Sequence, residues 1–108
     1  ITKKGVDKLR EFTLEDMAIP QPKKWDGKWR LVIFDIPNKM RNGRDALRHK
    51  LKELDFYPLQ KSIWVYPYPC FDEIMFIAEL FKITRFIDIV TAEEIMNEAK
   101  LRKYFGLL

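Results

Sequence analysis

The sequence of 108 residues contains one cysteine, Cys70, and one histidine, His49. A single cysteine excludes a disulfide within the chain and a zinc site made of several cysteines, and it is typical of a reducing compartment such as the cytoplasm. A single histidine excludes histidine-rich metal chemistry and argues against a Ser-His-Asp triad. The longest apolar runs, such as 31–34, are far shorter than a membrane-spanning helix requires, so we expect no contact with a membrane.

Aromatic residues are abundant by contrast, with 8 Phe, 4 Tyr and 3 Trp, and 47% of all residues are hydrophobic. A chain of this composition can bury a substantial core, which excludes intrinsic disorder, and its length is typical of one domain. Lys and Arg total 20 against 16 Asp and Glu, a net charge of +4. This modest excess is compatible with a nucleic-acid partner without requiring one.

The first 24 residues are expected to form a segment of their own. Apolar residues at a three-residue spacing predict a helix over residues 1–17. Pro20 and Pro22 then favour an extended backbone, which predicts a linker. The compact domain is therefore expected to span residues 25–108.

Within this domain, the hydrophobic pattern alternates between strand and helix signals. In chain order the expected elements are a buried strand at 30–36, a helix at 41–54, one long or two short strands at 56–66, a helix at 71–82, a strand at 85–90, and a terminal helix that begins at a capping box at 91–94 and ends at Phe105. This order is the ferredoxin-like βαββαβ plan of the α+β class, in which both helices cover one face of the sheet.

The second face of such a sheet is left open, and its composition bears on partners. In the strand expected near residue 64, Ile63 and Val65 alternate with Trp64 and Tyr66. We assign Trp64 and Tyr66 to the open face. An exposed aromatic surface usually contacts a partner, so we expect a homodimer or a second domain there.

The helix expected at 41–54 carries an apolar stripe, and the rest of its surface is mostly basic, Lys50 included. Such side chains neutralise the phosphate backbone of DNA or RNA without reading its sequence. A solvated surface partly balanced by Asp45 and Glu53 is the alternative. The candidate nucleic-acid-binding residues are Lys39, Arg41, Arg44, Arg48 and Lys52.

Three segments carry a resemblance to a known family. They are Trp-Asp-Gly-Lys-Trp-Arg at 25–30, Asp-Ile-Pro at 35–37 and Gln-Lys-Ser-Ile-Trp-Val-Tyr-Pro at 60–67. They resemble the central domain of PaaX, the family of phenylacetate-degradation repressors, and the likeness covers roughly residues 25–90. That domain is in turn similar to the small CRISPR-associated nuclease that forms the central dimer of the spacer-integration complex.

Residues 1–9 resemble the tail of a winged-helix DNA-binding domain, as found in those repressors. If this likeness holds, most of the DNA-reading domain precedes residue 1, and full sequence-specific binding is not expected of this chain alone.

The resemblance to the CRISPR proteins implies a role for Asp35. In those proteins an aspartate at the end of the first strand approaches its dimer mate and is held to bind a divalent metal, and Asp35 occupies that place. Asp35 is thus the candidate catalytic residue and ligand of Mg²⁺, shared across a dimer. Alternatively, its carboxylate caps the strand end or holds the following loop through Asn38. Ser62 matches the serine that follows the glutamine in the family pattern.

Other reactive or aromatic residues have simpler interpretations. His49 lies beside the apolar stripe and is expected at the surface or rim, and Cys70 is expected to be a small buried hydrophobe. For Ser62, a hydrogen bond to neighbouring backbone is favoured over nucleophilic work. For Trp64, core packing or a protein interface is favoured over base stacking, and Trp29 is expected in the core.

Two hypotheses follow. The first is a nucleic-acid-associated dimerisation domain of a PaaX-like transcriptional regulator. The second is a CRISPR-associated, Mg²⁺-dependent endonuclease or a spacer-integration scaffold with an integrase partner. Apart from Mg²⁺, no cofactor is expected.

Overall fold

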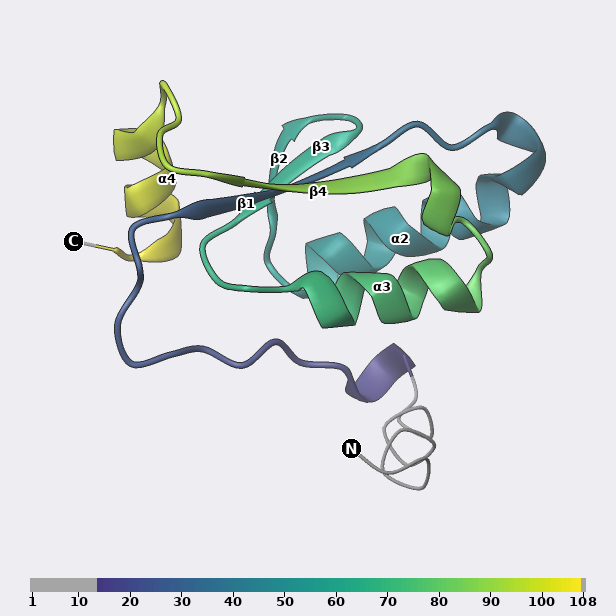
Figure 1. Ribbon diagram of the computed structural model, residues 1–108, viewed down its shortest axis with the longest axis horizontal. Coiled ribbons are helices and arrows are strands. Elements are labelled where there is room, and N and C mark those ends of the chain that lie inside the picture. Colours follow the sequence, from purple (N-terminus) through teal and green to yellow (C-terminus); the bar gives the residue numbers. More distant parts are fainter. Residues whose placement is uncertain (1–13, 108) are drawn as a thin grey trace.

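The computed structural model describes residues 14–107, and Figure 1 shows a four-stranded sheet with helices beside it. The predicted helix over 1–17 lies mostly outside the described residues; its end forms a short 3-10 helix. The elements are η1 (Leu14–Asp16), β1 (Trp29–Phe34), η2 (Asn38–Met40), α2 (Arg41–Glu53), β2 (Tyr57–Gln60), β3 (Ile63–Tyr66), α3 (Phe71–Leu80), η3 (Thr84–Phe86), β4 (Ile87–Ala92) and α4 (Glu98–Phe105).

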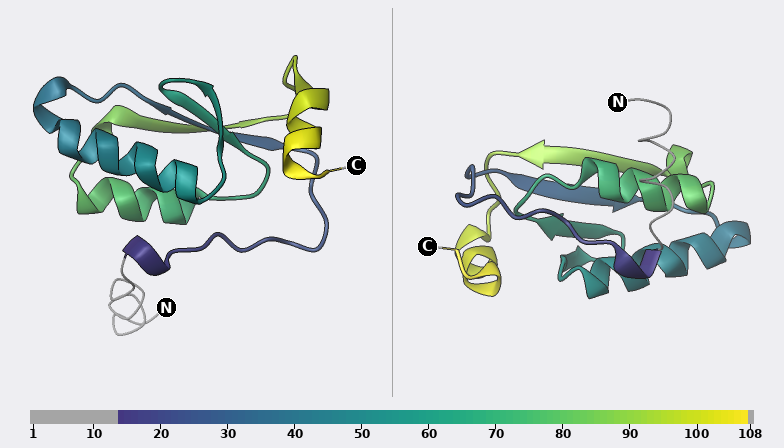
Figure 2. Two further views of the ribbon diagram at one scale, coloured as in Figure 1. Left: turned by 180° about the vertical axis from the view of Figure 1, so that it is seen from behind. Right: turned by 90° about the horizontal axis from the view of Figure 1, so that it is seen from below.

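The strands lie in the order β2-β3-β1-β4, and every neighbouring pair is antiparallel. α2 and α3 lie side by side on one face of the sheet (Figures 1 and 2). The predicted ferredoxin-like fold of the α+β class is therefore confirmed. The extended region at 56–66 consists of two short strands, because the backbone turns at Lys61 and Ser62.

The main core lies between the sheet and these two helices, and it contains Trp64 and Tyr66, which are 4% and 5% exposed. The assignment of these two side chains to the open face is wrong. Trp64 pairs with Val32 of β1, and paired residues in an antiparallel sheet point to the same face. Val32 faces the helices, so Trp64 does too, and Tyr66 stacks on Phe56 with ring centroids 4.3 Å apart.

The opposite face, which we call the outer face, carries a smaller core under α4. Trp29 is fully buried there with Val65 and Leu101, as the sequence predicted for Trp29. The indole Nε1 of Trp29 donates a hydrogen bond to Oε1 of Glu98 at 3.0 Å. This bond lowers the pKa of Glu98 below its ordinary value, with a further contribution from Arg102. α4 thus covers one end of the outer face (Figure 1).

The predicted start of the terminal helix is wrong. Thr91 lies in β4 opposite Arg30, and the pairing continues to Ala92 opposite Trp29. Hydrogen bonding to β1 therefore takes residues 91–92 into the sheet before a capping box can form. α4 begins only at Glu98 and ends, as expected, at Phe105; Gly106 follows it, and its φ of 68° is a left-handed conformation that glycine adopts readily.

Between η1 and β1, residues 17–28 run without helix or strand along the helix layer (Figure 2). Ile19 is buried in the main core and anchors this segment. At its end, both Asp26 carboxylate oxygens accept hydrogen bonds from Arg30, which lower the pKa of Asp26. Arg30 also donates to the backbone oxygen of Pro67 at 2.8 Å and so joins β1 to the end of β3.

Candidate nucleic-acid interface

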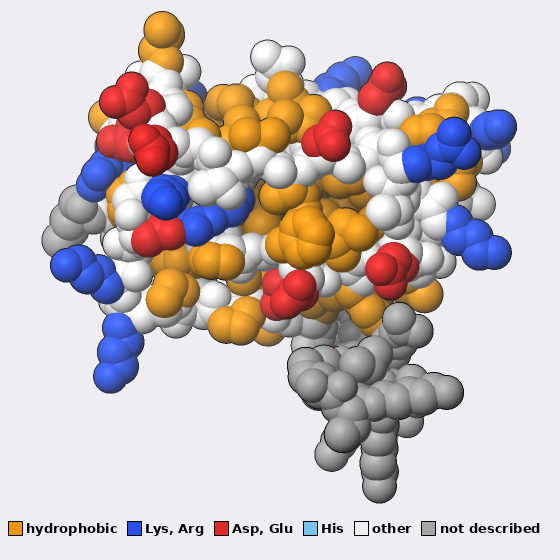
Figure 3. Space-filling view, viewed as in Figure 1, with side chains coloured by type: hydrophobic (Ala, Val, Ile, Leu, Met, Phe, Trp, Pro, Cys, Tyr) orange, Lys and Arg blue, Asp and Glu red, His pale blue; other side chains and the backbone are white. Residues whose placement is uncertain are grey.

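Four of the predicted phosphate contacts lie along α2 as one stripe. With about 100° of rotation per residue, their directions fall within an arc of about 80°. We call this set the basic stripe, and its members are Arg41, Arg44, Arg48 and Lys52. Arg41 and Lys52 are exposed, and the other two are half-buried. Lys39 is exposed in η2, just before the helix, and Figure 3 shows basic side chains gathered at this end of the molecule.

The buried side of α2, which adjoins the stripe, fixes the orientation of the stripe. Leu47 and Leu51 are fully buried against the sheet and α3. Gly43 lies so close to the segment after α3 that an added Cβ would be 3.1 Å from the Cβ of Phe81. Because α2 is held by these contacts, the basic stripe has one defined direction.

Arg48 and Lys52 line a groove of about 410 Å³, which we call the basic groove; its other lining residues are Pro58, Gln60, Lys61 and Trp64. The Arg48 guanidinium lies over the ring of Phe34, 5.7 Å from its centroid. Lys61 is exposed on the turn between β2 and β3. Three cationic side chains from two elements therefore surround one concave surface, and none of the residues that line it is acidic.

Trp64 forms part of the groove but is not free to stack on a base. Its ring is 4% exposed, and Nε1 donates to the backbone oxygen of Lys61 at 3.1 Å. The preference for packing over base stacking is confirmed for this residue. The groove therefore offers charge without an exposed stacking ring at this position.

Two other basic residues of α2 are engaged in contacts within the chain. Arg44 Nη2 donates to Oδ1 of Asn38 at 3.4 Å, and its Nε lies 4.0 Å from Oδ1 of Asp45. Lys50 is 2% exposed, and its ammonium donates to Oε2 of Glu53 at 3.4 Å. The placement of Lys50 on the basic surface is wrong, since α2 turns this side chain inward.

Asp35 directly follows β1 and is exposed. Its backbone N–H donates to the backbone oxygen of Phe86 at 2.9 Å, so the hydrogen bonding between β1 and the segment of β4 continues one residue beyond β1. By strand alternation, Asp35 follows Trp29, Leu31 and Ile33 along the outer face. Within residues 14–107 no group of three or more His, Cys, Asp or Glu side chains is placed to hold a metal ion. The Mg²⁺ site that the resemblance implied is shared across a dimer, so it would need ligands from a second copy of the chain.

The remaining candidate residues have structural positions. Ser62 lies in the β2–β3 turn, where its backbone oxygen accepts a hydrogen bond from Phe34 at 3.0 Å. The side chain of His49 is 76% exposed, with Nε2 3.6 Å from Oε2 of Glu53. Cys70 is 1% exposed, and burial raises the pKa of its thiol to about 12, so it is the buried hydrophobe that the sequence predicted.

The sequence did not reveal that Lys61 and Gln60 line the basic groove. The only available signal was the polar pair at 60–61 between two apolar segments, which is typical of a turn. The pairing of β2 with β3 places this turn beside α2, and no local pattern encodes that proximity.

The sheet order and the two helices on one face define this chain as a ferredoxin-like α+β domain. No helix within residues 14–107 combines the length and apolarity that crossing a bilayer demands. A family model described as the PaaX protein central Cas2-like domain matches residues 22–103, and the chain belongs to this family. The resemblance seen in the sequence is therefore confirmed. Comparisons with curated proteins and with solved structures give no match.

Proposed function

We propose that this chain is the dimerisation domain of a PaaX-like transcriptional regulator and that its basic groove contacts the phosphate backbone of nucleic acid. The observation that carries the proposal is the convergence of Arg48, Lys52 and Lys61 on one groove without an acidic neighbour in its lining. Membership in the PaaX family supports the regulator rather than an isolated enzyme.

The chemistry of the groove favours phosphate over bases. Guanidinium and ammonium groups bind phosphate oxygens, and such contacts position a protein on nucleic acid without reading its sequence. Trp64 is buried, so an exposed base has no stacking partner from this side chain. Binding by this surface is therefore expected to be independent of sequence and strongly dependent on salt.

The test compares the Arg48→Ala/Lys52→Ala variant with the wild-type chain on duplex DNA over a range of salt concentrations. If both side chains contact phosphate, the slope of log K against log salt decreases in magnitude by about 1.8. The matched control is Lys24→Ala/Lys103→Ala, which removes the same charge from exposed residues outside the groove. Equal slopes for the two variants would reject the groove as the contact.

The dimer proposal rests on the part of the outer face that α4 leaves uncovered. Leu31 and Val90 are paired across β1 and β4, and Ile33 and Ile63 are paired across β1 and β3. Val90 is 43% exposed and the others are half-buried. A second copy that packs on this face would bury these side chains around a twofold axis.

Sedimentation at several concentrations tests the dimer. Val90→Lys places a charge on the uncovered part of the outer face and is expected to yield monomers. Leu80→Lys is the matched control, because Leu80 is a similarly exposed apolar residue on α3, in the helix layer. Dimers that persist in the first variant, or monomers for the wild type, would contradict the proposed interface.

Asp35 provides one observation in favour of the second candidate, a Mg²⁺-dependent endonuclease. Its exposed carboxylate continues the row of outer-face residues, so a dimer through that face would bring two Asp35 side chains toward one axis. A nuclease assay with Mg²⁺ and with EDTA separates the two candidates. Cleavage that requires Mg²⁺ and is lost in Asp35→Asn would favour the enzyme, whereas no cleavage by the wild type would favour the regulator.

A further inference from the structure

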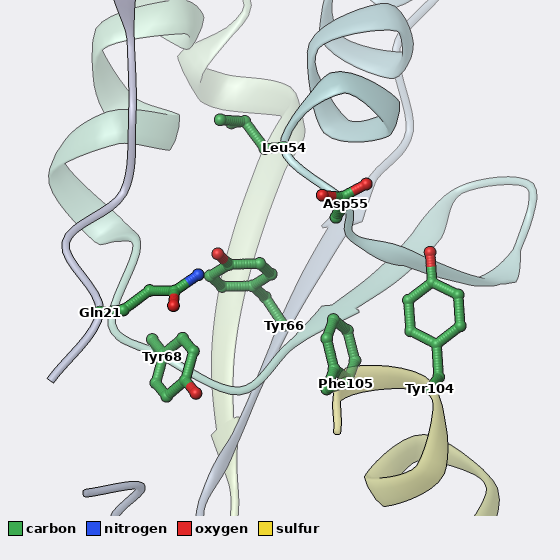
Figure 4. A pocket seen from close by; sticks show the side chains of 7 residues that line it. All are labelled: Gln21, Leu54, Asp55, Tyr66, Tyr68, Tyr104 and Phe105. Atoms are coloured by element: carbon green, nitrogen blue, oxygen red, sulfur yellow. The ribbon is translucent and has the colours of Figure 1, made fainter. Parts of the chain in front are cut away.

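A second cavity, of about 300 Å³, lies between α2, β3 and α4 (Figure 4). We call it the aromatic cavity, and its lining residues are Gln21, Leu54, Asp55, Tyr66, Tyr68, Tyr104 and Phe105. None of them lines the basic groove. Four of the seven are aromatic, and three of these are tyrosines, whose hydroxyl groups add to a lining that is mostly polar.

The rings are held in place by contacts with one another. Tyr66 stacks on Phe56, with ring centroids 4.3 Å apart. It also makes edge contacts with Tyr68 and with Phe105, and the ring centroids are 5.8 Å apart in both pairs. Phe105 also meets Tyr104, with ring centroids 4.8 Å apart. Rings with fixed positions form a preorganised surface, which reduces the entropy lost when a ligand binds.

The electrostatic character of the cavity is negative, although the whole chain carries a net positive charge. The Asp55 carboxylate lies between Tyr66 and Tyr104 in Figure 4. Within residues 14–107 the ion pairs of the chain do not include Asp55, and no Lys or Arg lines the cavity. Burial raises the pKa of the Tyr66 hydroxyl above its ordinary value, and the neighbouring Gln21 side chain opposes this shift.

Two helix ends border the cavity. Leu54 and Asp55 directly follow α2, and Tyr104 and Phe105 form the end of α4. The last carbonyl groups of both helices accept hydrogen bonds from the residues that follow, and the last turn of each helix carries basic side chains. The negative charge of the cavity lining therefore comes from the Asp55 carboxylate, which lies among four aromatic side chains.

We propose that the aromatic cavity binds a small organic cation of the alkylammonium class. Such a cation is attracted to ring faces and to the carboxylate together, and its alkyl groups fill the space between the rings. An anion is disfavoured by the same carboxylate. Because Gln21 belongs to the segment before β1 and Tyr104 to the last turn of α4, the occupant would also join these two segments to the domain.

The probe is choline, titrated into the 108-residue chain with chloride held constant by exchange against NaCl. Ring signals of the tyrosines are followed by NMR. 3,3-Dimethyl-1-butanol, which has the shape of choline without its charge, is titrated in parallel. We expect saturable shifts with choline and none with the alcohol, because the cavity selects charge as well as shape.

Two variants test whether choline binds at the residues of the aromatic cavity. Asp55→Asn removes the charge and suits the backbone, since Asp55 has a φ of 66° and asparagine tolerates this left-handed conformation. It is expected to bind choline about tenfold more weakly. Tyr104→Leu keeps apolar bulk at a half-exposed position and is expected to weaken binding severalfold. Glu79→Gln is the control, since it removes the same charge from an exposed residue of α3.

The combined result of selective choline binding, weaker binding in Asp55→Asn and Tyr104→Leu, and unchanged binding in Glu79→Gln supports the site. Absence of saturable shifts would overturn it, as would equal affinity for the uncharged alcohol. Choline binding that is unchanged in a folded Asp55→Asn variant would overturn it as well.

Discussion

Truncation of Trp29 tests whether α4 is an integral part of this domain. In Trp29→Ala, the small core on the outer face loses its largest member, a side chain with no exposed surface. The centroid of its indole ring lies 4.8 Å from that of Trp25 and 6.0 Å from that of Phe105. Phe105 belongs to α4, so the substitution removes a main attachment of that helix to the sheet.

The expected cost follows from burial. Replacing a fully buried Trp by Ala destabilises proteins by about 3–5 kcal/mol, through lost transfer free energy and the cavity left behind. The lost hydrogen bond to Glu98 adds little, because the carboxylate is one-third exposed and still accepts from Arg102 at 3.2 Å. Since domains have total stabilities of about 5–15 kcal/mol, the variant is expected to lose a large share of its stability.

Urea unfolding followed by circular dichroism measures this loss. Phe71→Ala is the control, because the Phe71 side chain is 60% exposed and its truncation is expected to change the free energy of unfolding by less than about 0.5 kcal/mol. A Trp29→Ala variant that unfolds at the same urea concentration as Phe71→Ala would refute the reasoning. It would mean that the outer-face core contributes nothing to folding.

Three further predictions concern single contacts. Trp29→Phe removes the hydrogen bond to Glu98, so the pKa of Glu98 rises toward its ordinary value of 4.5. A carboxyl group whose pKa is lower in the folded than in the unfolded state stabilises the fold at a pH above its unfolded pKa, and this stabilisation is lost as the pH falls through its folded pKa. The variant should therefore lose less stability than the wild type on acidification below 4.5. Unfolding midpoints at neutral and acidic pH will show the difference. Cys70, with a pKa of about 12, should react with a thiol reagent at mildly alkaline pH only after denaturant is added; rapid reaction of the native chain would contradict its burial. Gly43→Ala should lower the free energy of unfolding by about 1 kcal/mol in spite of the better helix propensity of alanine, because the new Cβ would lie 3.1 Å from the Cβ of Phe81; a stabilised variant in thermal unfolding would show that the helices separate easily.

The order of strands and helices was predictable from the sequence because it depends on local patterns. A short apolar run bounded by turn residues encodes β1, and apolar residues at helical spacing encode α2 and α3. The same patterns located the basic stripe, since side chains one turn apart on a helix share a direction. For these features the information lies within a few neighbouring residues.

The faces of the sheet were not predictable in this way. β3 reads Ile-Trp-Val-Tyr, with apolar side chains in both directions, so alternation separates Trp64 from Val65 but does not say which of them meets the helices. The register with β1 decides this, and the end of β4 likewise depends on its pairing with Trp29.

The sequence by itself determined the fold class, the family resemblance and one basic helix. Only the tertiary structure decided that Lys61 joins that helix in one groove and that Lys50 is turned inward. It also brought Asp55 and Tyr104 together, although they are far apart in the chain. The physical reason is that strand pairing and helix packing select contacts between distant residues, and such contacts leave no periodic trace in the sequence.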